Sequence, residues 1–261
     1  MKYCVMVLIC VLSLCGLLSC GLEEFYYIDY IPQGDYNDTN AVITLPSRGY
    51  EGYTTYFDNF IIFYRIYISG VTQVQTGDNL RTNSVDRSNI NQSLNADYTF
   101  FYSFTDITST TVNTSNLETT FGSRGYYVLT LENAEINNVL GSGSLGNRLE
   151  IAFPPNPREE PTLTLNNGDP HKLRRAAAAP AGQSSVIFSP RPNRNLLNSS
   201  ALYNNDNITL GNTDTVAYTA DTPRYTYVSL YIAARGRGGT PPLPIFSQPT
   251  FIGIFRLADS G

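Results

Sequence analysis

The sequence predicts a mainly β protein, an antiparallel β-sandwich, and three observations lead to this fold class. Apolar and polar residues alternate in about ten short segments, which is the period of a half-buried strand. The aromatic residues are mostly tyrosine (19) and phenylalanine (13), which favour strands. Glycine (20) and proline (15) separate the segments, as turns require. We therefore expect residues 25–261 to form one sandwich domain, immunoglobulin-like, fibronectin type III-like or related.

The clearest strand candidates have one wholly apolar face. Residues 60–68 place an aromatic or aliphatic side chain at every second position, and Arg65 lies on the opposite face, where it should reach solvent or a carboxylate. Residues 225–234 have an aliphatic face, and residues 250–257 are apolar on both faces, which predicts a central strand. The other candidates are 25–31, 41–45, 126–131, 149–153, 162–165, 185–188 and 214–218. The side chains expected in the core include Ile62, Ile66, Val228, Leu230 and Ile232.

One segment has a helical period instead. Ile90, Leu94, Tyr98 and Phe101 recur at spacings of four, four and three residues, which places them on one helical face. We expect a helix within residues 85–104 that crosses over between the sheets.

A proline-rich stretch follows the middle strands. Residues 154–182 hold six of the fifteen prolines and end in an alanine run, which predicts a long exposed loop. This loop could divide the chain into two domains. A single domain is favoured, because each half would have few strands for an independent core.

The N-terminal residues predict export from the cytoplasm and a lipid anchor. Lys2 precedes a 16-residue apolar run from Tyr3 to Leu18, which is typical of a cleaved secretory signal over residues 1–19. The run is shorter than the ~20 residues of a spanning helix, although an uncleaved N-terminal helix is the alternative. Leu17-Leu18-Ser19-Cys20 resembles the bacterial lipobox, in which the cysteine is diacylated on sulfur and becomes the N-terminus. Cys20 is thus the predicted lipidation site, with fatty acids such as palmitate, and residues 20–24 form a short tether.

Cysteine usage and charge exclude several classes of site and partner. Cleavage before Cys20 would remove Cys4, Cys10 and Cys15, so the mature chain could form no intramolecular disulfide and no cysteine-based metal site. It would also remove Lys2, which lowers the net charge from −5 to −6. An acidic chain without a basic cluster is not expected to bind nucleic acid.

Three aromatic-rich segments carry a family resemblance: FIIFYRIYIS (60–69), LNADYTFFYSF (94–104) and the segment from Tyr225 to Leu257. They resemble a group of uncharacterised lipoproteins from spirochaetes of the Treponema type. The resemblance implies an exported, lipid-anchored β-sandwich of the bacterial cell envelope. It implies no catalytic residue.

Candidate metal and catalytic residues have simpler interpretations. His171 is the sole histidine and lies in the proline-rich stretch, which favours a solvated loop residue over a zinc or triad site. Asp35, Asn37, Asp38, Asp206 and Asn207 could offer oxygen ligands to calcium, but their spacing is typical of ordinary turns. The segment TPPLP (240–244) is expected to be a rigid hairpin loop. No catalytic residue, metal ligand or cofactor is assigned.

The sequence favours binding or structure over catalysis. With one histidine and no second mature cysteine, the chain has few ways to activate a nucleophile, and we expect no enzymatic activity. A module that binds a host or envelope protein is the favoured function. Alternatives are a glycan-binding module, which would show tyrosines along a concave sheet face, and a carboxylate-based glycoside hydrolase, which would show two acids in a cleft. The membrane and the face to which the anchor belongs stay open.

Overall fold

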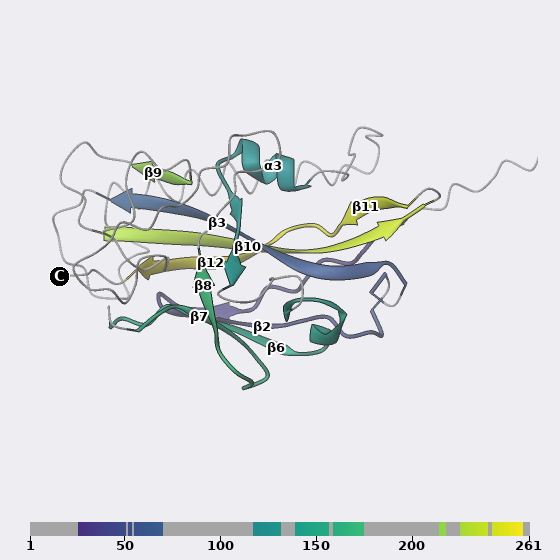
Figure 1. The fold of residues 1–261 in the computed structure, drawn as a ribbon, viewed down its shortest axis with the longest axis horizontal. Coiled ribbons are helices and arrows are strands. Elements are labelled where there is room, and N and C mark those ends of the chain that lie inside the picture. Colours follow the sequence, from purple (N-terminus) through teal and green to yellow (C-terminus); the bar gives the residue numbers. More distant parts are fainter. Residues whose placement is uncertain are drawn as a thin grey trace, which may run out of the picture.

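The computed structural model describes residues 26–50, 52–53, 55–69, 117–131, 139–156, 159–174, 214–217, 225–239 and 242–257. Within these ranges the protein is mainly β, with two stacked sheets and a short helix, α3 (Leu117–Ser123). Figure 1 shows the sheets as two layers, with α3 above the outer face of the upper layer. The predicted class, a mainly β chain with two antiparallel sheets, is confirmed.

The first sheet has six strands in the order β1-β2-β6-β7-β8-β5, all antiparallel. The strands are β1 (Asp35–Tyr36), β2 (Asn40–Thr44), β5 (Thr130–Leu131), β6 (Arg148–Ala152), β7 (Thr162–Leu165) and β8 (His171–Arg174). Predicted strands 41–45, 149–153 and 162–165 correspond to β2, β6 and β7 and are confirmed.

The second sheet is built on two long strands, β3 (Phe57–Ser69) and β10 (Tyr225–Gly238), which pair antiparallel along almost their whole lengths. Along one edge of β10, β12 (Thr250–Leu257) pairs with its first half and β11 (Leu243–Phe246) with its second. β4 (Tyr127–Val128) and the parallel β9 (Thr215–Ala217) lie beside β3. Predicted strands 60–68, 214–218 and 225–234 are confirmed. β10 and β11 form a hairpin, in which Leu243 and Pro244 of the TPPLP segment belong to β11, and residues 240–241 lie outside the described residues.

The two sheets meet through one short segment. β4 pairs with β3 of the second sheet, and β5, one residue further along the chain, pairs with β8 of the first. Between them the Leu129 amide donates to the carbonyl of Ile62 at 2.8 Å. One sheet therefore curls into a half-barrel instead of lying flat on the other.

The main core lies between the layers. It includes Ile62, Ile66, Val228, Leu230 and Ile232, each fully buried, so the predicted core residues are confirmed. The register brings Ile66 opposite Val228 and Ile62 opposite Ile232. The period-two alternation therefore identified this face of β3 and β10 correctly.

The outer face of β3 and β10 is buried as well. Phe63 stacks on Phe121 of α3 at 4.1 Å between ring centroids, and Phe121 meets Tyr231 edge-on. Arg65 lies on this face and is half-buried, with its guanidinium over the Tyr67 ring at 5.5 Å. The face on which Arg65 was expected to reach solvent or a carboxylate is thus a second, aromatic core beneath α3.

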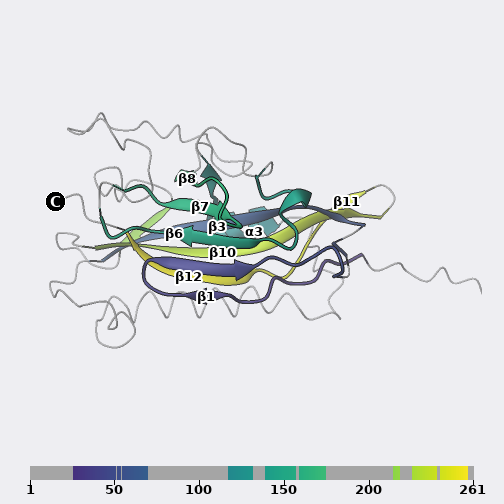
Figure 2. The same ribbon diagram turned by 90° about the horizontal axis from the view of Figure 1, so that it is seen from below.

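One predicted strand is absent, and another has a different place in its sheet. The described part of 25–31 joins no ladder; instead, Tyr26 and Ile28 lie against Gly238 and Gly236 of β10. The strand predicted at residues 250–257 is confirmed as β12, but it is not central: it pairs with β10 alone among the described strands, and the Tyr36 ring covers it, 5.8 Å from that of Phe251. Figure 2 shows β1 and β12 together at this edge.

The expected long loop is only partly a loop. β8 lies within residues 154–182 as well as the predicted strand β7, so the loop prediction is wrong for His171–Arg174. The predicted helix at 85–104 and the strand at 185–188 lie outside the described residues.

Candidate functional site

Cys20, the predicted lipidation site, lies outside the described residues, which begin at Tyr26. Residues 26–31 pack against the second half of β10. A Cβ added to Gly238 would lie 2.4 Å from the Cβ of Tyr26, and one on Gly236 would lie 2.6 Å from Cδ1 of Ile28. The glycines of β10 thus make room for the N-terminal segment. The first described residue, Tyr26, therefore lies beside the end of β10 that leads into the β10–β11 hairpin.

Residues 26–31 are also fixed to the loop that precedes β3. The Tyr53 hydroxyl donates to the Asp29 carbonyl at 2.5 Å. Gly52 has φ +84°, and a Cβ there would lie 2.4 Å from the Tyr27 carbonyl oxygen, so only glycine allows this close approach. At the other end of the segment, the Thr250 hydroxyl donates to the Ile31 carbonyl.

The described part of the chain exposes three large aromatic side chains. They are Tyr27 (47%), Tyr30 (57%) and Tyr50 (48%), and they lie on the two segments that Gly52 and Tyr53 hold together. We call these three residues the tyrosine surface. The sequence analysis did not identify it, because a strand prediction for 25–31 would have buried every second side chain.

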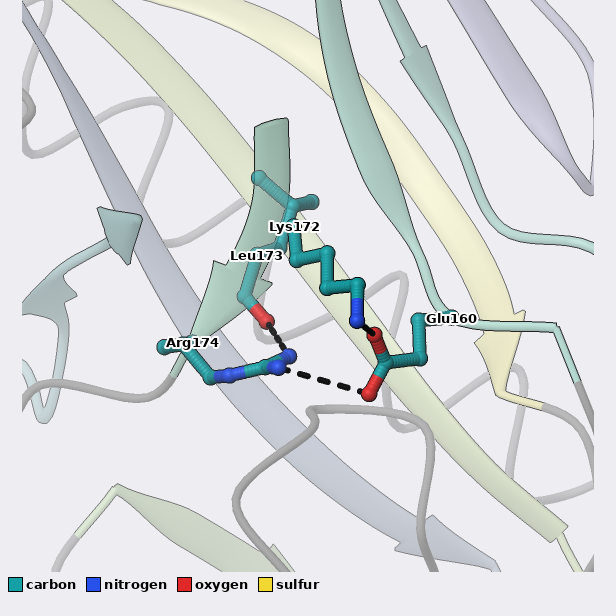
Figure 3. A network of polar contacts seen from close by, with 4 residues as sticks. All are labelled: Glu160, Lys172, Leu173 and Arg174. Carbon is teal, nitrogen blue, oxygen red and sulfur yellow. Dashed lines mark hydrogen bonds and ion pairs between the residues drawn. The ribbon is translucent and has the colours of Figure 1, made fainter. Parts of the chain in front are cut away.

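A charged cluster lies where β8 passes Glu160, two residues before β7 (Figure 3). Lys172 Nζ is 2.7 Å from one Glu160 carboxylate oxygen, and Arg174 Nη2 is 3.3 Å from the other. The side chains of Glu160 and Arg174 are mostly buried, whereas that of Lys172 is half exposed. Arg174 also donates to the carbonyl of Leu173 at 3.0 Å. The cluster joins β8 to the start of β7, which is a structural use of these charges.

A second buried carboxylate lies at the beginning of β9. Asp214 accepts hydrogen bonds from the Tyr64 hydroxyl at 2.8 Å and the Thr215 hydroxyl at 3.0 Å. Its backbone carbonyl accepts from the Ile66 amide at 2.9 Å. These contacts hold β9 against β3, so Asp214 serves the packing of the sheet.

Hydroxyl groups line the aromatic core beneath α3. Tyr126 Oη lies 3.4 Å from both Tyr67 Oη and Ser229 Oγ, and the Arg65 guanidinium lies 5.8 Å from the Tyr126 ring centroid. Ser229 is completely buried. These contacts give the buried hydroxyl groups hydrogen-bond partners inside an apolar layer.

Of the residues considered as metal ligands, Asn37 forms a turn, whereas Asp35 lies in strand β1. Asn37 Oδ1 accepts from the amides of Thr39 and Asn40 at 2.8 and 2.9 Å, an Asx turn between β1 and β2, as expected. Asp206 and Asn207 lie outside the described residues. Within the described ranges, no group of three histidine, cysteine or acidic side chains is placed to hold a metal ion.

His171 is not the solvated loop residue that was predicted. It lies in β8, where it is half-buried and pairs with Leu163 of β7.

In the described part of the chain, no helix is long and apolar enough to span a bilayer.

Comparison with known proteins gives no relative: no family model, no curated protein and no solved structure matches this chain.

Proposed function

We propose that the protein is a lipid-anchored lipoprotein of the bacterial cell envelope that works by binding or by structure and not by catalysis. The observation that carries this proposal is the lipobox-like Leu17-Leu18-Ser19-Cys20 at the end of an apolar run with one preceding lysine. The described domain begins six residues after Cys20, which suits an anchor on a short tether. The resemblance to spirochaetal lipoproteins, and with it an immunoglobulin-like or fibronectin-like sandwich, is part of the proposal.

The use of the buried charges supports a non-catalytic role. The Asp214 carboxylate accepts hydrogen bonds from two hydroxyl groups within a sheet, and the Glu160 carboxylate forms ion pairs with two cations of β8. A glycosidase needs two carboxyl groups facing each other across a substrate. Neither buried acid is arranged in that way by these contacts.

The distribution of tyrosine favours a protein partner over a glycan. Seven described tyrosines are buried in the two cores, and the three exposed ones lie outside the strands, on the 26–31 segment and the loop joined to it. A row of open rings for stacking on sugars is therefore not part of the described sheets. We propose a host or envelope protein as the partner class, with a glycan as the alternative, and no binding of nucleic acid.

Metabolic labelling with a fatty acid tests the anchor. The full chain should incorporate label, Cys15→Ala should incorporate it equally, and Cys20→Ala should incorporate none and retain residues 1–19. Label in Cys20→Ala, or none in the unchanged chain, would disprove the lipid anchor. A binding screen of the purified protein against matrix proteins, envelope extracts and glycans then tests the partner class.

A further inference from the structure

We infer that the tyrosine surface, formed by Tyr27, Tyr30 and Tyr50, lies in the headgroup region of the bilayer that holds the anchor. The domain would then rest on the membrane by a defined end instead of moving freely above it. This inference rests on the proposed lipidation of Cys20.

The length of the tether is the first argument. Six residue steps separate Cys20 from Tyr26, and a fully extended chain gains at most ~3.6 Å per step, or about 22 Å in total. The polar headgroup layer accounts for about 5–8 Å of this distance on one side of a bilayer. The N-terminal end of the domain therefore stays close to the membrane surface in every conformation of the tether.

The placement of the exposed rings is the second argument. Tyr27 and Tyr30 belong to the first described segment after the tether. Tyr50 belongs to the loop that Gly52 and Tyr53 join to that segment. Among the described residues, all large exposed aromatic or aliphatic side chains are thus found on the first described segment and on the loop joined to it.

The chemistry of tyrosine is the third argument. Its ring is apolar and its hydroxyl is polar, so it is enriched where one end of a side chain is dry and the other is wet, as at membrane interfaces. Three half-exposed rings would bind a bilayer weakly if the domain were free. A short tether supplies an effective concentration on the order of millimolar, so weak affinity is sufficient for steady contact. Since the mature chain is acidic, the contact should not depend on anionic lipid.

Site-specific fluorescence on liposomes tests the inference. Acylation occupies Cys20 and cleavage removes the other cysteines, so one introduced cysteine is the sole free thiol of the mature lipoprotein. Arg48→Cys places a probe on the exposed loop beside Tyr50 without changing the tyrosine surface. Glu159→Cys is the control, because it lies beyond the opposite end of β6. The start of β6 lies beside the loop, where the Leu45 amide donates to the Asn147 carbonyl, and Glu159 comes after the end of that strand.

The lipoprotein is reconstituted in phosphatidylcholine liposomes that contain a lipid with a quencher at headgroup depth. We expect severalfold stronger quenching of the probe at position 48 than at 159, unchanged by high salt. Replacing Tyr27, Tyr30 and Tyr50 together by serine should remove the difference. Replacing all three by phenylalanine should preserve it, because the rings are kept.

Two results would overturn the inference while the lipid anchor stands. Equal quenching at both positions on liposomes that carry acylated protein would show that the domain does not rest on this end. A change in the fluorescence of the probe at position 48 that occurs without lipid and only at high protein concentration would assign the tyrosine surface to a second copy of the chain. Absence of acylation, seen as failure to float with liposomes, would disprove the proposed anchor and this inference together.

Discussion

The hydroxyl of Tyr53 donates a hydrogen bond to the backbone carbonyl of Asp29, and this bond ties the N-terminal segment to the loop before β3. The Tyr53 ring is buried against Phe57 and Phe60, at 5.4 and 6.1 Å between centroids. Burial raises the pKa of the Tyr53 hydroxyl above its usual range, and the nearby Asp29 carboxylate raises it further. The segment that carries the tether is therefore fixed by a hydroxyl that must stay protonated.

Tyr53→Phe should lower the free energy of unfolding at neutral pH by about 0.5–1.5 kcal/mol, the usual net value of one hydrogen bond. The effect should also depend on pH. Above pH ~10 the unfolded tyrosine loses its proton while the folded one keeps it, so the folded wild-type protein binds more protons and loses stability as the pH rises.

Denaturant unfolding between neutral pH and pH ~11 measures both effects. The wild-type protein should lose stability more steeply above pH ~10 than Tyr53→Phe does. Tyr50→Phe, at an exposed tyrosine in the same loop, should keep the wild-type slope. Equal slopes for wild type and Tyr53→Phe would refute the buried, bonded hydroxyl.

Gly236→Ala should destabilise the protein because two elements approach β10 at this position. A Cβ on Gly236 would lie 1.9 Å from the Tyr56 carbonyl oxygen, so backbone would have to move at a typical overpacking cost of about 1–3 kcal/mol. Gly49→Ala is the matched control, since its Cβ would meet only Ser47 Oγ at 3.6 Å. Thermal melts of the two variants should differ by several degrees, and similar melting temperatures would show that residues 26–31 and Tyr56 do not pack here.

The long strands were predictable because each encodes its own pattern. Within each segment apolar side chains recur at every second position; Ile62 and Ile66 belong to this pattern in β3, and Leu230 belongs to it in β10. A strand that buries this face places its apolar side chains together in the core. The short strands β1 and β8 have no such run: β1 holds two residues, and β8 reads HKLR, whereas the equally short β7 alternates Thr with Leu. The sequence could not show that α3 covers the other face of β3, because that contact joins residues far apart in the chain.

The tyrosine surface was also beyond pattern reasoning. Residues 25–31 have the composition of a strand, and a strand would have alternated inward and outward side chains. In the structure Ile28 and Ile31 are buried three residues apart, and Tyr27 and Tyr30 are exposed with the same spacing. The cause is tertiary: the glycines of β10 and Gly52 receive this segment, and no local rule predicts that.

Leu230→Ala should cost about 2–5 kcal/mol of unfolding free energy, because the side chain is fully buried in the main core and the cavity cannot fill. Leu165→Ala, at the half-buried end of β7, should cost less with the same chemical change. Urea unfolding monitored by tyrosine fluorescence compares the two. A smaller loss for Leu230→Ala would contradict the proposed packing between the sheets.

The Glu160 cluster gives a prediction about partly buried charge. Glu160→Gln should weaken the bonds to both cations of β8 and lower stability by about 1.5–3 kcal/mol, the range for hydrogen bonds to charged groups. Glu159→Gln next to it should change stability by less than ~0.5 kcal/mol, because Glu159 is exposed and the new amide keeps an oxygen for Asn156.

Burial should also separate the two cations. Lys172 is half exposed, so water and salt screen its pair with Glu160, and Lys172→Met should cost no more than ~1 kcal/mol. Arg174 is only 11% exposed and also donates to the Leu173 carbonyl, so Arg174→Met should cost clearly more. Unfolding at low and high salt distinguishes the pairs, since the loss for Lys172→Met should shrink with salt while that for Arg174→Met should persist. If the two variants lose the same stability and respond equally to salt, the cluster is a surface charge pattern and does not fasten β8 to the start of β7.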